Sequence, residues 1–353
     1  MYDLVTNFPI RPNKSTNLGS LYSIILNNVF AKMFDCEHKD IINVLHSYKD
    51  IKPNVSIIRT DLDNLGFYNR LYKDDEHIED LKNLILRLTE ERIIYEKEET
   101  MLQCDCGRID MKIDTKNNNL KLFNEEDNCK FCHSVPHERT KKVLVMKLDE
   151  RYLSGINVYP SFLLKEINIL IERFKNKEVV ISKNRTTGIE INVNGVNYNI
   201  DIDLLASMLP QFNNSEKELI TVCNRHLYNV MICNFINNVL GDKKIDFLLY
   251  PFVNGINNFQ SEILGKDTVQ ILLIMLNSLK WRNKDLIFDE RLIDLYSSMH
   301  PKKAKGLLSS LIRIQEVQEL KTLEDVLYKG FGNAEMIKNM KKLKEINNSE
   351  CVK

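Results

Sequence analysis

The chain has 353 residues, 43% of them hydrophobic, which is enough to bury a sizeable core in one large domain with an insertion or in two modest domains. Its 49 basic side chains balance 49 acidic ones, so the overall charge indicates neither a nucleic-acid nor a membrane partner, and RNA binding would need a local patch. The N-terminus lacks a secretion-signal pattern and no apolar stretch is long enough to cross a membrane, so a cytoplasmic protein is expected.

Apolar spacing predicts alternating strands and helices in the first part of the chain. Residues 4–8 form a short apolar run that predicts a strand, and after a proline-containing loop the apolar positions of 21–34 recur at helical spacing. A second β-like run at 56–59 precedes an amphipathic helical pattern over 78–95. The order strand, helix, strand, helix predicts a parallel sheet.

The same periodicities predict the elements of the second part. Strands or hairpins are expected at 143–148, 178–181, 188–200, 246–250 and 259–264, and helices at 162–174, 216–240, 268–279 and from 302 onward. The dipeptide Asn194-Gly195 favours a two-residue hairpin turn. Between 104 and 132 the periodicity gives way to polar loops, as expected of a small insertion that binds a metal.

Two cysteine pairs form the most specific motif. Their members are Cys104, Cys106, Cys129 and Cys132. Four thiolates complete a tetrahedral shell, which predicts a structural Zn²⁺ with no open position for a substrate. His133 or His137 could replace one thiolate, and four unrelated buried cysteines are the alternative, which the polar surroundings disfavour.

The loop between the first strand and the first helix is a candidate anion site. Backbone N–H groups at a helix start favour a phosphate, and Asn17-Leu18-Gly19-Ser20 lies at this place, after Pro12. The alternative is an ordinary connection in which a Ser or Thr caps the helix. The loop considered alone favours this alternative.

This loop and several later segments resemble, in the same order, class I aminoacyl-tRNA synthetases of the methionyl and leucyl type. In that family a His-Ile-Gly-His signature opens the first helix, and here Asn17 and Ser20 stand in place of both histidines. The resemblance implies catalytic roles for Asn17 and Ser20 and ATP binding by Pro12 and Gly19. The passage 88–98 and the cysteine pair that follows it resemble the zinc knuckle of methionyl enzymes.

Three further segments extend the resemblance. Residues 180–189 look like the passage that leads out of the family's connective insertion. Asp203 falls at the acidic position of a Tyr-Val-Trp-Phe-Asp-Ala motif, which implies a contact with the substrate, although this chain lacks the aromatic residues. Gly265 and Asp267 resemble a Gly-x-Asp turn, which implies ATP binding through the ribose.

A lysine-rich stretch follows the segment that ends at Met299. Lys302 and Lys305 have the spacing of the family's Lys-Met-Ser-Lys-Ser loop, which implies that they are catalytic and stabilise charge on the triphosphate. A solvated basic linker is the alternative.

The resemblance implies an α/β fold, namely a Rossmann-like parallel sheet with a zinc-knuckle insertion and a short C-terminal helical segment. The expected boundaries are 1–98 and 179–299 for the two halves of the catalytic domain, 99–178 for the insertion, and 300–353 for a Lys-rich loop and helices.

The implied function is ATP-dependent amino-acid activation, with Mg²⁺ accompanying ATP. The acyl group would pass to a tRNA acceptor end or to a non-tRNA amine, thiol or carrier protein, because no anticodon-binding domain is expected after Gly306. One alternative is a catalytically inactive synthetase-like binding or regulatory module. A zinc-ribbon nucleic-acid protein is another, but it would need a basic face that the composition does not show.

Overall fold

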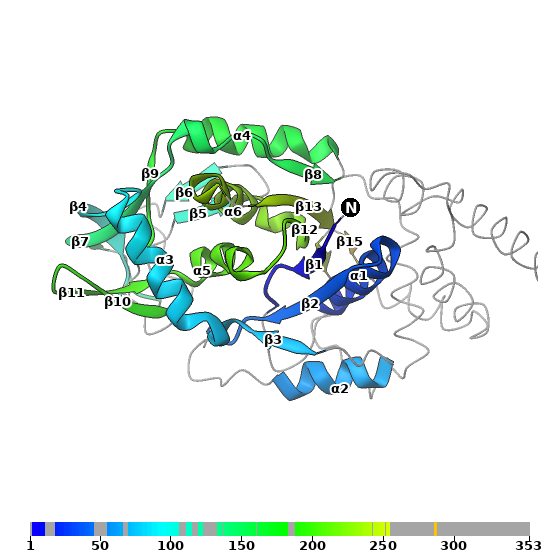
Figure 1. Ribbon diagram of the computed structural model, residues 1–353. Helices are drawn as coiled ribbons and strands as arrows, with labels where there is room; N and C mark the ends of the chain where they lie inside the picture. Colours follow the sequence, from blue (N-terminus) through cyan, green and yellow to red (C-terminus); the bar gives the residue numbers. More distant parts are fainter. Residues whose placement is uncertain are drawn as a thin grey trace, which may run out of the picture.

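The computed structural model describes residues 2–10, 18–45, 55–65, 70–105, 111–114, 119–122, 133–135, 137–159, 161–182, 188–241, 243–250, 252–254 and 286–287. A six-stranded sheet lies at the centre of this part, with strand order β3-β2-β1-β12-β13-β8 (Figure 1). All neighbouring strands in it are parallel. The strands are β1 (Leu4–Asn7), β2 (Glu37–Ile42), β3 (Leu71–Lys73), β8 (Asn157–Tyr159), β12 (Lys217–Cys223) and β13 (Lys244–Tyr250).

The strand order reverses at the centre of the sheet. From β1 the chain proceeds to β2 and β3 on one side, whereas β12 is followed by β13 on the other side. β1 and β12 are therefore neighbours, with Leu4 opposite Glu218 and Asn7 opposite Thr221. In such doubly wound sheets, ligands bind in the crevice outside the carboxyl ends of the strands where the order reverses.

Helices cover both faces of this sheet (Figure 1). They are α1 (Leu18–Phe34), α2 (Val55–Leu65), α3 (Ile78–Glu90), α4 (Leu164–Phe174), α5 (Ile202–Met208) and α6 (Leu227–Leu240). The short 3-10 turns are η1 (Asp74–His77), η2 (Glu150–Tyr152), η3 (Ser161–Leu163), η4 (Leu209–Phe212) and η5 (Asn224–His226). α6 ends at Gly241, whose φ of 77° gives the left-handed cap that favours glycine. Within the described ranges, none of the helices combines the length and apolar character needed to span a bilayer.

A second, antiparallel sheet joins β4 (Ile94–Gln103), β7 (His137–Lys147) and β9 (Glu178–Val180). Three pairs of strands complete the described part: β5 (Met111–Asp114) with β6 (Asn119–Leu122), β10 (Ile189–Val193) with β11 (Val196–Ile200), and β14 (Val253–Asn254) with β15 (Leu286–Ile287). Asn194 and Gly195 form the turn of the β10–β11 hairpin with φ of 50° and 82°, which confirms the predicted two-residue turn. β8 lies within the range expected for the insertion and forms an edge of the main sheet.

Two sequence predictions of secondary structure are wrong, and a third extends too far. The β-like run at 56–59 lies in α2, because Ile58 and Leu62 are one helical turn apart and both are buried. The predicted helix at 216–240 begins only at Leu227, since 217–223 is β12. A central parallel strand is buried on both faces, so its continuous apolar run cannot be distinguished from a buried helix by periodicity.

The prediction that extends too far is the helix over 78–95, because α3 ends at Glu90 and β4 begins at Ile94. The strand predicted at 259–264, the helix at 268–279 and the helical segment from 302 onward lie outside the described residues.

Candidate functional site

The residues that leave β1 are fixed across three strand ends. The backbone N–H of Phe8 donates to the carbonyl of Thr221 in β12 at 2.8 Å. Ile10 then pairs with the end of β2, where its N–H donates to the Ile41 carbonyl at 2.9 Å and its carbonyl accepts from the Asn43 N–H at 2.8 Å. The connection to α1 therefore starts at a defined position over the carboxyl edge of the sheet.

A buried polar network lies under this connection, between α1 and the strand ends. The side-chain amide of Asn27 in α1 donates to Asn7 Oδ1 at 3.2 Å and to Asp40 Oδ1 at 2.9 Å, and its oxygen accepts from the Thr221 hydroxyl at 2.6 Å. Asn7 Oδ1 also accepts from the backbone N–H of Ile41 at 2.7 Å, and Asn7 Nδ2 donates to the Ile41 carbonyl at 3.0 Å. These four side chains are at most 1% exposed, so their hydrogen bonds fix α1 relative to β1, β2 and β12.

The first turn of α1 extends beyond the ends of the strands. The Phe34 ring at the other end of the helix contacts the Tyr2 ring before β1, with centroids 4.8 Å apart, so α1 runs antiparallel to β1. Ser20 lies seven residues before Asn27, which is about two turns and places it on the same helix face. Gly19 and Ser20 thus lie in the first turn at the carboxyl edge, where backbone N–H groups favour an anion.

The turn that follows β12 also lies at this edge. The ring of His226 stacks on that of Phe8, with centroids 5.4 Å apart and planes 28° apart, and so links the ends of β12 and β1. Asn224 Oδ1 accepts from the backbone N–H of Phe252, just after β13, at 2.9 Å. The guanidinium carbon of Arg225 lies 3.4 Å from the centroid of the Phe252 ring. Sequence reasoning missed this turn because it assigned these residues to the interior of a helix.

Asp203 lies in the first turn of α5, which Asp201 caps by accepting from the Asp203 N–H at 3.0 Å. The Asp203 carbonyl accepts from the side chain of Asn229 in the first turn of α6 at 3.1 Å. α6 starts directly after the turn that follows β12, so the structure brings the start of α5 close to that turn. Burial and the charge of Asp203 raise the pKa of Tyr228 in α6.

Asp74 fixes the residues that follow β2. Its Oδ1 atom accepts from the backbone N–H groups of Val44 at 2.7 Å and Leu45 at 3.1 Å. Burial raises the pKa of this carboxyl to about 6, although these two hydrogen bonds act in the opposite direction. The ends of β1, β2 and β12 are therefore each held by contacts from a neighbouring element.

Another buried carboxyl, that of Glu218, lies on the face of the central strands opposite to α1. Glu218 Oε1 accepts from the Thr6 hydroxyl at 2.5 Å and from Asn213 Nδ2 at 3.0 Å, whereas Oε2 has no hydrogen-bond partner within the described ranges. Burial raises the pKa of Glu218 to about 7, against the attraction of Lys243 and Lys39. Lys243 itself donates to the carbonyls of Pro210 and Asn213.

The predicted metal ligands are described only in part. Cys104 follows β4 and is fully buried, whereas Cys106, Cys129 and Cys132 lie outside the described residues. The backbone N–H of Asp105 donates to the Ser134 hydroxyl at 3.1 Å, and Gln103 pairs with His137 at the end of the β4–β7 ladder. Cys104 thus lies beside the residues that follow the second pair. Among the described side chains, no group of three or more potential metal ligands occurs.

Most of the other predicted site residues also lie outside the part of the chain that the structure describes. These are Pro12, Asn17, Gly265, Asp267, Lys302 and Lys305. Of the predicted catalytic, ATP-binding and substrate-binding residues, the structure brings Ser20, Gly19 and Asp203 to elements that begin at or beside the carboxyl edge.

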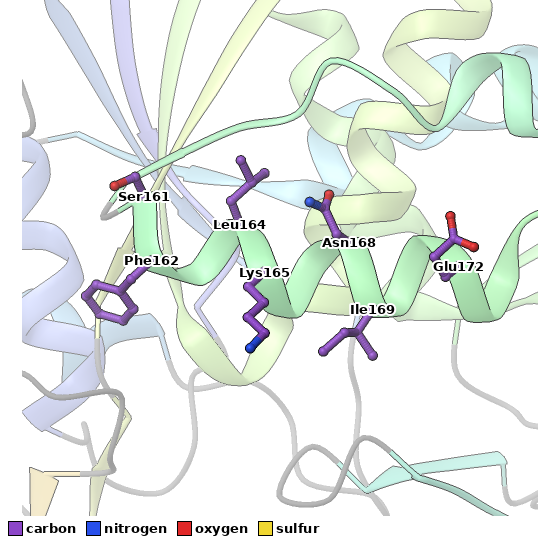
Figure 2. Close-up of a pocket in the computed structure, with 7 residues that line it drawn as sticks. All are labelled: Ser161, Phe162, Leu164, Lys165, Asn168, Ile169 and Glu172. Carbon is purple, nitrogen blue, oxygen red and sulfur yellow. The ribbon is translucent and has the colours of Figure 1, made fainter.

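One pocket of about 730 Å³ is lined by residues on the outer face of η3 and α4. Figure 2 shows Phe162, Lys165 and Ile169 extending to the same side of this segment. α4 packs against α6 beside β8, the edge strand, so β13 separates the pocket from the β1–β12 reversal. None of the sequence-predicted site residues lines it.

No protein-family model and no curated protein sequence matches the chain. Solved structures of methionyl-tRNA synthetase from Mycobacterium tuberculosis resemble it. Two of them, both bound to methionyl-adenylate, align with TM-scores of 0.59 and 0.60 at 11% and 12% identity, over 84% of this chain and 68% of theirs. The apo form aligns with a TM-score of 0.58 at 14% identity, over 82% of this chain and 64% of its own. The described part of this chain therefore has a class I synthetase-like fold.

Proposed function

We propose that the chain binds ATP and an amino acid at the carboxyl edge of β1 and β12 and joins them as an aminoacyl adenylate. The observation that carries this proposal is the reversal of strand order at β1 and β12, with the first turn of α1 beside it, in a fold similar to that of synthetases solved with methionyl-adenylate. In this reaction the amino-acid carboxylate attacks the α-phosphorus of ATP and pyrophosphate leaves.

The phosphates are proposed to lie near Asn17, Gly19 and Ser20. Backbone N–H groups in the first turn of α1 are directed out of the helix end, and the buried Asn27 network holds that helix in place. The side chains of Asn17 and Ser20 donate hydrogen bonds but carry no positive charge, so they assist phosphate binding as neutral donors.

The remaining roles rest on the sequence resemblance. Pro12 and Gly265 are proposed to contact ATP through the backbone, and Asp267 through the ribose hydroxyls. Lys302 and Lys305 would supply the positive charge that stabilises the transition state as charge develops on the departing pyrophosphate, with Mg²⁺ bound to the phosphates.

The amino acid is proposed to lie beside α5, where Asp203 occupies the first turn. The acyl group would then pass to the acceptor end of a tRNA or to a non-tRNA amine, thiol or carrier protein.

A structural Zn²⁺ is proposed at Cys104, Cys106, Cys129 and Cys132. The burial of Cys104 and the hydrogen bond between Asp105 and Ser134 support this set, because they place Cys104 at the same end of the β4–β7 ladder as the residues that follow the second pair. Bound Zn²⁺ would cross-link these turns and supply no catalysis. Elemental analysis should give about one zinc per chain, and a metal-free protein whose four thiols all titrate in the folded state would contradict the site.

A catalytically inactive binding module is the second candidate. The replacement of both signature histidines by Asn17 and Ser20 favours it, because it removes two cationic donors from the phosphate site. Both candidate functions include nucleotide binding, and only the enzyme converts the bound nucleotide.

Exchange of labelled pyrophosphate into ATP separates the two candidates. The full chain should catalyse exchange that depends on one or a few of the common amino acids, and the double variant Lys302→Ala/Lys305→Ala should lower the rate more than the affinity for ATP. Binding of ATP without exchange, for any amino acid, would support the inactive module instead.

A further inference from the structure

The turn after β12 places basic side chains at the carboxyl edge of the sheet. β12 is the strand beside β1, so its carboxyl end forms one side of the reversal point. The residues of this turn are Asn224, Arg225 and His226, and none of them has a carboxylate. An arginine side chain has only hydrogen-bond donors and a permanent positive charge, so it favours an anion over sugar hydroxyls.

The guanidinium group of Arg225 is held in place by aromatic packing. Its central carbon lies 3.4 Å from the centroid of the Phe252 ring, and Asn224 fixes the backbone of Phe252 through a 2.9 Å hydrogen bond. A guanidinium stacked flat on a ring keeps its N–H groups around the rim of the stack, and its fixed position lowers the entropy lost on binding. This arrangement suits bidentate recognition of two oxygen atoms of one anion.

Two helix N-termini add to the positive potential at this edge. α1 and α6 both begin here, with 17 and 14 residues respectively, and neither has an acidic residue in its first turn. Each N-terminus carries a partial positive charge from aligned peptide dipoles. His226, stacked on Phe8, bridges the space between the ends of β12 and β1.

We infer that Arg225 binds the phosphate group of the nucleotide at the β1–β12 reversal. The inference rests on the proposed nucleotide binding and adds to it a phosphate partner outside the α1 loop. A phosphate fits this place better than a carboxylate, because an arginine together with two helix N-termini supplies positive charge for more than one negative charge.

AMP and adenosine test this inference, because they differ only by the phosphate. Titration calorimetry of the full chain should compare both ligands on wild type, Arg225→Ala, Arg225→Lys and Arg70→Ala. Arg70 is a matched control, since its guanidinium carbon also lies over a ring, that of Tyr72 at 4.6 Å, but just before β3 and hence at the amino edge of the sheet. Arg225→Ala should weaken AMP binding roughly 10- to 100-fold, as expected for losing a charged hydrogen-bond partner.

Adenosine affinity should change by less than about 2-fold in the same variant, because adenosine carries no phosphate, and Arg225→Lys should fall between wild type and alanine for AMP. Equal losses for AMP and adenosine, or no change in either, would overturn the role of Arg225 and leave nucleotide binding in place. A loss confined to amino-acid binding would assign Arg225 to a carboxylate and also overturn the inference. A wild-type chain that binds neither AMP, adenosine nor ATP would contradict the proposed function itself.

Discussion

The two faces of the central strands carry two buried polar clusters with different properties. Adjacent residues of β1 point to opposite faces, so Thr6 contributes to one cluster and Asn7 to the other. On the α1 face, Asn7, Asn27 and Thr221 bind one another directly or through shared partners. On the opposite face, Glu218 keeps one oxygen without a hydrogen bond from any described residue, and its pKa is raised to about 7.

The difference separates a rigid support from a pH-sensitive element. A cluster in which donors match acceptors fixes the geometry above it. A buried carboxyl with one oxygen that accepts no hydrogen bond makes the stability of the same strands depend on its protonation. The candidate site lies over the first cluster, whose hydrogen bonds fix its geometry, whereas Glu218 makes the stability of the sheet depend on pH.

Replacement of Glu218 is expected to have the largest effect on the pH dependence of the free energy of unfolding. Its folded pKa of about 7 is above the ordinary value of 4.5, so the folded state binds the proton more tightly and stability falls as pH rises from about 4.5 to 7. The loss should be about 3 kcal/mol, from 1.36 kcal/mol for each unit of pKa. Glu218→Gln should remove most of this slope in urea unfolding measured across that pH range. A variant that retains the wild-type slope would contradict the assignment.

Asn27→Ala should test the cluster on the α1 face. The substitution leaves Asn7, Asp40 and Thr221 without a shared partner, so the free energy of unfolding should fall by about 2 kcal/mol at pH 7. Urea unfolding measures it, and Asn192→Ala is the control. Asn192 bonds Asn197 on the exposed β10–β11 hairpin, so this control should change stability by less than about 0.5 kcal/mol. Equal effects of the two variants would show that the Asn27 cluster is not a special support.

Loss of the hydrogen bonds that Asp74 accepts should have the smallest effect on the free energy of unfolding. Asp74→Ala removes the acceptor of the Val44 and Leu45 N–H groups and should cost about 1 kcal/mol, as does the loss of a capping residue. Asp74→Asn keeps an oxygen in that position and should restore most of this stability. It should also remove a fall in stability of about 3 kcal/mol as pH rises from about 4 to 6, because the folded pKa of Asp74 is raised to about 6 and each unit of pKa corresponds to about 1.36 kcal/mol. Thermal unfolding of both variants at pH 5 and pH 7 would reveal a failure of either expectation.

The sequence was sufficient where a short segment has a clear local pattern. Residues 4–8, 21–34 and 188–200 were correctly predicted, because short apolar runs, helical spacing and an Asn-Gly turn each have one structural meaning. It failed at 217–223, where a strand buried on both faces has no alternation. That error concealed the turn carrying Arg225, since the position of a turn depends on recognising the strand before it.

The buried clusters could not be predicted at all. Asn7, Asn27 and Thr221 are polar residues in ordinary apolar segments, and only the pairing of β1 with β12 brings them together. Periodicity identifies which face of an element is buried, but it carries no information about which buried polar groups meet across distant strands.

The central claim is that the nucleotide binds where the strand order reverses between β1 and β12. A crystal structure of the full chain with ATP, Mg²⁺ and the amino acid that supports exchange tests it directly. The account predicts density for the phosphates between the first turn of α1, at Gly19 and Ser20, and the turn that carries Arg225. Nucleotide density at another place, such as the α4 pocket lined by Phe162 and Ile169, would contradict it.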